Sequence, residues 1–212
     1  VLFGDGAGAV VIEESKSESD GEIYSFSNGL SSDNLEILEI PNFGSAMDRF
    51  KTDEAARVRW TFDGQEIFKS GVRAMAQASA EAIEKSGLSK DDVDIFIPHQ
   101  ANIRIVEALE KKLGLPNATT IKKVHRYGNT SAASIPTAFV DALEEGEIKG
   151  GEIAVFTAVG AGLAWGACAV RLGDRVTPIN KSDAKLPDFD GTATDTIKKA
   201  IEYQVPDKLD KI

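Results

Sequence analysis

Residues 94–113 read DIFIPHQANIRIVEALEKKL, and this stretch decides the fold class. Asp94–Pro98 is a short apolar run with the length of a buried strand. Residues 102–113 then carry apolar side chains at helical spacing, and Gly114 and Pro116 stop the helix. The stretch predicts a strand that leads directly into a helix, which is the repeating step of an α/β protein.

Similar strand and helix signals recur along the chain. Asp63 predicts the start of a helix that runs from about Gly64 to Lys85. Residues 29–60 are polar and irregular, which is long for a loop and indicates a functional or interface excursion. The last two strands are separated only by residues 160–163, so they can pair as a hairpin. The other predicted elements are strands at 9–13, 22–27 (with Ile23 and Phe26 as its apolar residues), 120–124, 152–159 and 164–172, and a helix at 130–144 with Pro136 near its first turn.

A weak internal repeat indicates a duplicated fold. Gly8-Ala9-Val10-Val11-Ile12 resembles Gly166-Ala167-Cys168-Ala169-Val170, and each follows a glycine-rich turn. The chain also begins inside a hydrophobic run, Val1-Leu2-Phe3, with no Met. We therefore interpret it as a fragment of a longer protein that starts at the last strand of a first copy.

Composition limits the partners and the compartment. The 212 residues include 24 Lys+Arg and 34 Asp+Glu, and the resulting net charge of −10 argues against nucleic acid as a main partner. No apolar run approaches the roughly 20 residues that span a bilayer. The single cysteine, Cys168, cannot form an internal disulfide, and no secretion signal is present. These features predict a cytoplasmic protein without a membrane span.

The character of the sequence changes after Asp174. Prolines at 178, 187 and 206 interrupt a charged, polar stretch. One short helix is predicted at about 194–203, with Asp195 near its start. We expect the rest to be an extended arm on another surface or partly disordered.

Two polar side chains stand out at predicted strand-to-helix junctions. His99 follows the strand at 94–98, and Asn129 lies in a Gly-Asn-Thr-Ser turn before the helix at 130–144. Ligands prefer this side of an α/β sheet. A neutral imidazole N–H and an amide N–H aimed at one oxygen would stabilise an enolate, and the turn at 159–162 could add a backbone N–H.

Simpler hypotheses stand beside each of these. A histidine at a strand end is more often structural, an asparagine in such a turn is more often a cap, and residues 159–162 could be a plain hairpin turn. His125 is predicted to be a surface residue. Cys168 lies within a predicted strand, where thiols are usually inert.

One face of the predicted helix at 102–113 is basic. Arg104 and Lys111 fall together with Lys112 nearby, opposite an apolar face. The default interpretation is a solvated face. The alternative is a basic patch beside the mouth of an active site, which could steer an acidic partner.

Five ordered motifs carry a resemblance to a known family. The chain resembles β-ketoacyl-acyl-carrier-protein synthase III, the initiating condensing enzyme of type II fatty-acid synthesis in the thiolase superfamily, over about residues 1–172. The motifs are FGDGAGAVV at 3–11, FDGQEIFK at 62–69, PHQAN at 98–102 followed by Arg104, RYGNTSAASIP at 126–136 and GAGLAWG at 160–166.

The resemblance implies the C-terminal half of a thiolase-like fold, with a mixed five-stranded sheet flanked by helices and an extended C-terminal tail. Residues 1–30 would hold the last strand of the first half and the first strand of the second. Residues 31–172 would form the C-terminal thiolase-like domain, and residues 173–212 a C-terminal extension.

The resemblance also implies a Cys-His-Asn triad, with His99 and Asn129 as its second and third members and the cysteine before residue 1. In this family the thiolate takes an acyl group from acyl-CoA without a cofactor. Malonyl-acyl-carrier protein then decarboxylates, and its carbanion attacks the acyl-enzyme thioester. His99 and Asn129 would hold the malonyl thioester oxygen, and the Ala161 backbone N–H would contribute to the oxyanion hole.

Further positions match family surfaces. Phe68, Ala101 and Asn102 match the pantetheine channel. The implied partners are acyl carrier protein, acyl-CoA, the N-terminal half of the same protein and a second copy in a homodimer. The residues that match the carrier-protein docking surface are Lys69, Arg104, Lys111 and Lys112.

The sequence departs from the family in two places. Val159 stands where the family often has Phe, and the tail after about Gly173 extends beyond the usual family end. Two rival hypotheses remain, which are a related thiolase-fold acyltransferase of specialised metabolism and a non-catalytic carrier-protein-binding module. Elongating synthases are less favoured, because their pattern resembles a pair of histidines, whereas residue 129 is Asn.

Overall fold

The computed structural model describes residues 3–17, 19–33, 35–40, 61–177, 183–185, 190–192, 194–195 and 198. The chain divides into two compact units, one formed by Val1–Glu39 with Phe62–Thr177 and the other by Ile40–Thr61 with Pro178–Ile212. The first unit contains the main sheet and every candidate site residue.

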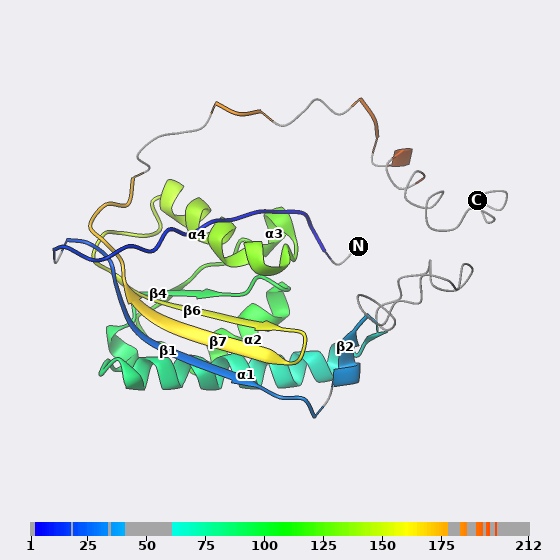
Figure 1. The fold of residues 1–212 in the computed structure, drawn as a ribbon, viewed down its shortest axis with the longest axis horizontal. Helices are drawn as coiled ribbons and strands as arrows, with labels where there is room; N and C mark the ends of the chain where they lie inside the picture. The colour runs from blue at the N-terminus through cyan, green and yellow to red at the C-terminus, as the bar shows by residue number, and fades with distance from the viewer. Residues whose placement is uncertain are drawn as a thin grey trace. The chain divides into compact units, whose positions relative to one another are not determined.

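A mixed five-stranded sheet forms the centre of the first unit (Figure 1). Its strand order is β1-β7-β6-β4-β5. β4 runs parallel to β5 and β6, whereas β7 is antiparallel to both β6 and β1. The predicted α/β class and mixed sheet are therefore confirmed. The strands are β1 (Glu22–Leu30), β4 (Ile95–Pro98), β5 (Thr119–Thr120), β6 (Ile153–Gly160) and β7 (Ala164–Arg171).

Helices cover both faces of this sheet (Figure 1). The helices are α1 (Gly64–Lys85), α2 (Ile103–Leu113), α3 (Val124–Tyr127) and α4 (Ser134–Glu144). Short 3-10 turns are η1 (Leu35–Ile37), η3 (Lys90–Asp92) and η4 (Ser131–Ala133). Two further strands of two residues each, β2 (Leu38–Glu39) and β3 (Thr61–Phe62), lie outside the main sheet.

Two apolar clusters fill the space between the sheet and its helices. On one face, residues of α1 and α2 such as Met75 and Leu109 pack with Phe96 of β4. On the other face, Ala138 and Ala142 of α4 pack against strand side chains that point away from α1 and α2. Successive side chains of β4 alternate between these clusters, so the sheet separates the core into two layers.

Local signals explain where the two long helices begin. The Asp63 carboxylate accepts hydrogen bonds from the backbone N–H groups of Gln65 (3.1 Å) and Glu66 (3.0 Å) and so caps α1. The Asn102 side chain caps α2 by accepting from Ile105 N–H at 3.0 Å. The helices predicted at 64–85 and 102–113 and the hairpin of β6 with β7 are confirmed.

The strand predicted at 9–13 does not form. Residues 4–15 carry neither helix nor strand, and Val10, Val11 and Ile12 are exposed, Val11 by 89%. The segment's link to the fold is an isolated parallel bridge between Phe3 and Asn129. An apolar run becomes a strand only when another strand satisfies its backbone groups, and no described strand lies beside residues 9–13.

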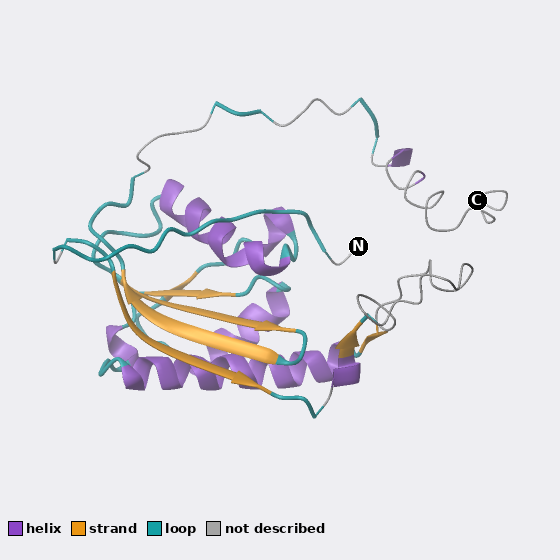
Figure 2. Cartoon of the chain, viewed as in Figure 1, coloured by secondary structure: helices purple, strands orange, loops and turns teal. Residues whose placement is uncertain are grey.

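The glycines of this segment serve close packing instead of a turn. Gly4, Gly6 and Gly8 alternate along it, and a Cβ atom on each would collide with or crowd the segment at 127–136. The clashing partners are the Tyr127 carbonyl for Gly4 and the Pro136 ring for Gly8. The loop passes beside α4 without becoming a strand (Figure 2).

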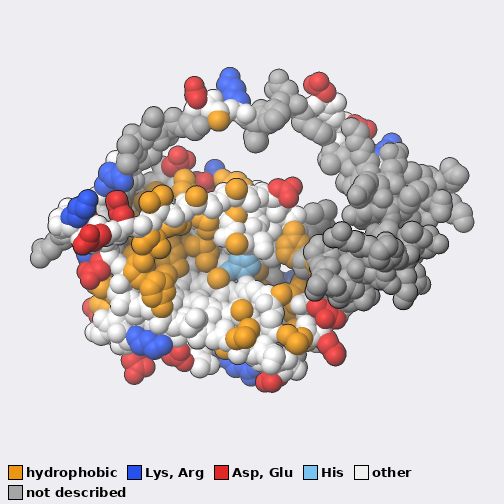
Figure 3. Space-filling model, in the orientation of Figure 1, with side chains coloured by type: hydrophobic (Ala, Val, Ile, Leu, Met, Phe, Trp, Pro, Cys, Tyr) orange, Lys and Arg blue, Asp and Glu red, His pale blue; other side chains and the backbone are white. Residues whose placement is uncertain are grey.

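The strand predicted at 22–27 forms, but its apolar residues do not make its buried face. Ser25 and Ser27 are buried, and the Ser25 hydroxyl donates to the Ala82 carbonyl of α1 at 2.5 Å. Phe26 is 63% exposed, and Ile23 is also exposed. The polar side chains of this strand are therefore buried because hydrogen bonds to α1 satisfy them. In Figure 3, hydrophobic side chains gather on the side of the molecule that carries β1.

Two other predictions need correction or fall outside the described residues. The strand predicted at 120–124 is limited to Thr119–Thr120, and Val124 begins the helical turn α3. Residues 41–60 of the predicted excursion at 29–60 lie outside the described residues. Of the helix predicted at 194–203, the described residues 194, 195 and 198 are helical, and the rest lies outside the description.

Candidate active site

His99 lies at the end of β4, with its backbone tied to β6. Its N–H donates to the Thr157 carbonyl at 2.8 Å, and its side chain is only 9% exposed. Its ring nitrogen Nδ1 lies 2.6 Å from the Ser134 hydroxyl at the start of α4. Burial lowers the pKa of His99 below the ordinary 6.5, so the imidazole is held in its neutral form.

Gln100 connects this strand end to the segment that leads to Asn129. The side chain is 2% exposed and uses both ends of its amide. Its Nε2 donates to the carbonyls of Pro98 (2.7 Å) and Ile121 (3.1 Å), and its Oε1 accepts from the N–H groups of Lys123 (2.8 Å) and Val124 (3.2 Å). These bonds explain why the chain turns into α3 after residue 122. Sequence reasoning missed Gln100, although its place directly after His99 is a signal.

Asn129 lies between α3 and η4, so the predicted strand-to-helix junction is wrong, because a helical turn and not a strand precedes it. Its side-chain oxygen accepts from Ser131 N–H at 2.8 Å, and its carbonyl accepts from Gly4 N–H at 2.9 Å. Within the described chain the side-chain nitrogen has no hydrogen-bond partner. This N–H2 group can therefore donate to a ligand.

Ser134, which contacts His99, belongs to the same segment of the chain as Asn129. No hydrogen bond joins His99 and Asn129 among the described residues, but Ser134 touches the His99 ring and follows Asn129 by one short turn. Thr130, next to Asn129, is buried, and its hydroxyl finds no partner within the described residues. The segment 129–134 thus brings the Ser134 hydroxyl to the end of β4.

An ion-pair network fixes α3 against the end of α4. Lys123 is almost fully buried and binds Glu145 (2.7 Å) and Glu147 (3.0 Å). Burial by itself lowers the pKa of Lys123, but hydrogen bonds to the two carboxylates outweigh it and raise the pKa. Arg126 binds Asp141 at 2.8 Å. The loop that carries Asn129 is therefore anchored on its N-terminal side.

Ala161 is exposed in the turn between β6 and β7. Its backbone N–H makes no hydrogen bond within the described part of the chain. It is therefore free to donate to a ligand, as an oxyanion-hole group must be.

The three predicted channel residues occupy two settings. Phe68 and Ala101 are half-buried against the α1–α2 cluster, and Val159 packs on the same cluster. Gly71 of α1 approaches Val159 so closely that a Cβ there would lie 3.4 Å from its Cγ1. Asn102 is exposed, and its side-chain oxygen is already used in the cap of α2.

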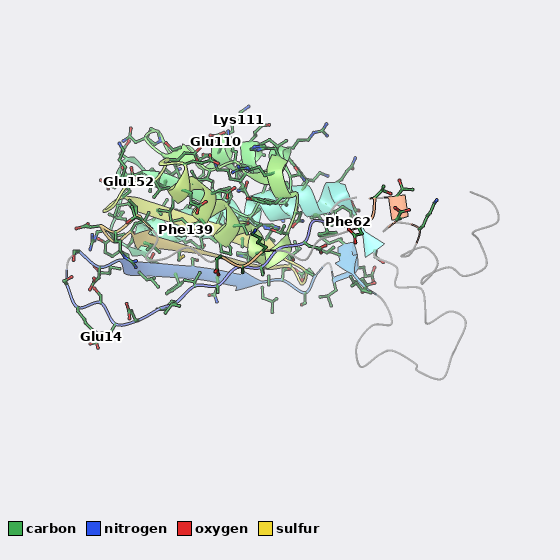
Figure 4. All side chains as sticks on the ribbon, turned by 90° about the horizontal axis from the view of Figure 1, so that it is seen from above. Glu14, Phe62, Glu110, Lys111, Phe139 and Glu152 are labelled. Atoms are coloured by element: carbon green, nitrogen blue, oxygen red, sulfur yellow. The ribbon has the colours of Figure 1, made fainter. Side chains whose placement is uncertain are left out.

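The four predicted docking residues are all exposed. Lys69 lies on α1, whereas Arg104, Lys111 and Lys112 lie on α2. None of the four forms an ion pair with another described residue, in contrast to Lys122, which binds Glu110 at 2.7 Å. Lys111 and Glu110 lie at the outer rim of the molecule in Figure 4. These cations are therefore available to an acidic partner.

Neither remaining reactive side chain fits a nucleophile. Cys168 lies in β7, and burial raises the pKa of its thiol, which disfavours the thiolate. His125 is exposed on α3, as predicted. Across the described residues no cluster of His, Cys, Asp and Glu is arranged to hold a metal ion, and no helix combines the length and apolarity needed to cross a membrane.

Comparison with known proteins places this geometry in a family. The family described as 3-oxoacyl-[acyl-carrier-protein] synthase III C terminal matches residues 83–172, a range that includes His99, Asn129 and Ala161. The β-ketoacyl-[acyl-carrier-protein] synthase III 2 of Vibrio cholerae is 48% identical over 205 residues, which cover 96% of this chain and 55% of that protein. The synthase III of Bacillus pumilus is 46% identical over 173 residues, covering 82% of this chain and 50% of that protein.

A solved structure agrees. The synthase III of Pseudomonas aeruginosa PAO1 superposes with a TM-score of 0.72 at 32% identity, covering 84% of this chain and 52% of that one. The chain is a synthase III-like member of the thiolase superfamily. This synthase III-like chain spans about half the length of the curated relatives it matches.

The C-terminal extension of the synthase III-like chain has a counterpart in one relative. Only 177 residues precede Pro178, yet the Vibrio cholerae match covers 205 residues. That match therefore includes part of the extension, whereas the Bacillus pumilus match covers 173 residues. The tail that lies beyond the usual family end is thus a feature shared with some synthase III proteins.

Proposed function

We propose that this chain forms the C-terminal part of a 3-oxoacyl-acyl-carrier-protein synthase III, in which His99 and Asn129 polarise the malonyl thioester carbonyl. The observation that carries the proposal is the setting of His99. A buried, neutral imidazole at the end of a central strand contacts the segment that carries Asn129 through Nδ1 and Ser134, and its other nitrogen, Nε2, makes no hydrogen bond with the described residues. Two neutral donors of this kind suit a developing enolate oxygen.

The proposed reaction is a decarboxylative Claisen condensation. The bond between the malonyl carboxylate and the adjacent carbon breaks, CO2 leaves, and the electron pair forms an enolate. The enolate carbon attacks the acyl-cysteine thioester, a carbon–carbon bond forms, and the cysteine thiolate leaves. His99 and Asn129 donate hydrogen bonds to the enolate oxygen, and the Ala161 N–H donates to the oxyanion of the acyl thioester.

The nucleophilic cysteine is proposed to come from residues outside this chain, because Cys168 is unsuited to the role. We propose that residues 31–172 and β1 pack against an N-terminal half that supplies it, in a homodimer. Acyl-CoA would enter beside Phe68 and Ala101, with Asn102 at the channel, and no cofactor is needed.

The reaction is tested with a protein that joins this chain to an N-terminal half carrying the cysteine. The assay measures condensation by this joined protein. We expect a 3-oxoacyl product from acyl-CoA and malonyl-acyl-carrier protein. Replacing His99 with Ala should lower the rate by about 10²–10³-fold, as the loss of one oxyanion donor does. His125→Ala serves as the matched control and should leave the rate unchanged. Absence of a 3-oxoacyl product from the joined protein would overturn the proposal.

The docking of acyl carrier protein is a separate part of the proposal. Its support is the group of four exposed cations on α1 and α2, none of which forms an ion pair with another described residue. Lys111→Glu with Lys112→Glu should abolish capture of acyl carrier protein, because the partner is acidic. Lys16→Glu with Lys149→Glu changes the net charge equally at other exposed sites and should retain capture. Equal capture by both double variants would contradict the docking site.

One observation favours a related acyltransferase of specialised metabolism as a second candidate. A priming β-ketosynthase of the R1128 polyketide pathway is 31% identical with a TM-score of 0.66 and covers 72% of this chain and 45% of that one. Product analysis with several acyl-CoA primers separates the two candidates. Acceptance of short fatty-acyl primers supports the fatty-acid synthase, and exclusive use of another primer class supports the second candidate.

A further inference from the structure

Ser134 lies in the motif at 126–136, but neither the motifs nor the triad gives it a role. We propose that Ser134 is a positioning residue that fixes the neutral His99 ring in the tautomer whose proton is on Nε2. The tautomer is a property of this chain, whereas its use in condensation rests on the proposed function.

The contacts of Ser134 converge on His99 and its neighbour. Ser134 is the first residue of α4, and its side chain is 2% exposed. Its Oγ lies 2.6 Å from His99 Nδ1 and 3.2 Å from the backbone nitrogen of Gln100. Both contacts are made by one hydroxyl that is shielded from water.

Counting protons settles the direction of the short bond. The Gln100 N–H can only donate, so it uses an acceptor position of the Ser134 oxygen. The hydroxyl has one proton, and His99 Nδ1 is the acceptor that the described residues offer it. If Nδ1 carried the ring proton instead, it would donate to the oxygen and leave the buried hydroxyl proton without an acceptor. Such an unsatisfied buried donor is unfavourable, so Nδ1 accepts.

The consequence appears on the other side of the ring. A neutral imidazole carries one proton, and Nδ1 as acceptor places this proton on Nε2. Nε2 makes no hydrogen bond with the described residues, so its N–H can donate to a ligand oxygen. Ser134 thereby turns His99 into a fixed hydrogen-bond donor without any proton transfer.

A purely structural role for Ser134 makes a different prediction. Ser79 provides the matched control because it is also a fully buried helical serine, and its hydroxyl donates to the Met75 carbonyl at 2.8 Å. If Ser134 only fills space, Ser134→Ala and Ser79→Ala should both leave the His99 tautomer unchanged. If Ser134 sets the tautomer, only Ser134→Ala should change it.

The test is ¹H–¹⁵N NMR of the chain with ¹⁵N-labelled histidine, at a pH at which both rings are neutral. We expect one ring, His99, to show a non-protonated Nδ1 and a protonated Nε2. Exposed His125 should show averaged tautomers and serves as the internal reference. In Ser134→Ala the His99 signals should move toward this averaged pattern, and Ser134→Thr should restore the fixed pattern.

The wild-type spectrum alone can overturn the proposal, so the test does not depend on the folding of a variant. A protonated Nδ1 in wild-type His99, or an unchanged tautomer in folded Ser134→Ala, would be decisive against it. Because the measurement needs no substrate, it is independent of the proposed function. A fixed Nε2–H tautomer in a joined protein that forms no 3-oxoacyl product would reject the condensation and keep the role of Ser134.

Discussion

The two faces of the main sheet are covered to different extents. On the α1–α2 face, Phe96 is 0% exposed within a cluster that includes Met75 and Leu109. On the α4 face, the cover ends before β1, where Phe26 is 63% exposed and pairs in register with half-buried Cys168. Val10–Ile12 add further exposed apolar residues. A large exposed apolar area of this kind is typical of an interaction surface.

A pair of phenylalanine substitutions tests this difference most directly. Phe96→Ala should lower the free energy of unfolding by about 3–5 kcal/mol, since it leaves a cavity in a closed core. Phe26→Ala should change it by no more than about 0.5 kcal/mol, because water already reaches the ring. Urea unfolding measures both values. Equal losses for the two variants would show that the β1 end of the α4 face is closed.

Gln100→Met tests the polar contacts between the end of β4 and the segment that leads into α3. The buried N–H groups of Lys123 and Val124 would lose their acceptor, which should cost about 1–3 kcal/mol of unfolding free energy. Gln77→Met is the control, because Gln77 is exposed on α1 and its side chain binds Glu81. A loss no larger than that of the control would mean that the Gln100 amide does not hold this segment.

The stability of the fold should fall as the pH falls below 6.5. Burial holds the pKa of His99 below this ordinary value, so in this range the unfolded chain binds a proton more readily than the folded chain. The contribution is complete above the unfolded pKa and is lost as the pH falls toward the folded pKa. Urea unfolding at several pH values should show a smaller slope for His99→Gln than for the wild type. A flat wild-type profile near 6.5 would contradict the buried neutral ring.

Thr130→Val should produce the smallest change. The valine has the same shape, and the replaced hydroxyl is buried without a partner in the described chain. We expect an unfolding free energy that is unchanged or raised by up to about 1 kcal/mol. A clear loss in the urea titration would reveal that the hydroxyl has a partner on the α4 face.

The contrast between the faces also shows which parts of the fold a sequence can predict. The α1 helix follows from Asp63 and the apolar spacing after it, because its cap and its buried face are local features. The run at 9–13 has the composition of a strand, but strand formation depends on a neighbour that composition does not reveal. The burial of polar residues on β1 has a similar cause, since Ser25 and Ser27 are buried by partners on α1 that lie more than 50 residues away in sequence.

The candidate site divides in the same way. His99 was predictable because it directly follows a strand that is visible in the sequence. Ser134 lies 35 residues from His99 in sequence, and only the packing of α4 on β4 brings them together. Residues 124–127 form α3 because the Gln100 amide binds the start of this segment. The local apolar residues alone predicted that the strand at 120–124 would continue there, and that prediction was wrong. Residues that act through tertiary contacts are the ones that motif analysis misses.

Because glycines alternate at 4, 6 and 8, the N-terminal segment should respond differently to deletions of one residue and of two residues. Each even position lies flat against residues 127–136, so a deletion of one residue would press Asp5 or Ala7 into the space of a missing Cβ. A deletion of two residues would return a glycine to each contact. The length of this segment can therefore change in steps of two more easily than in steps of one, and its register on the Asn129 loop is set by an odd–even rule.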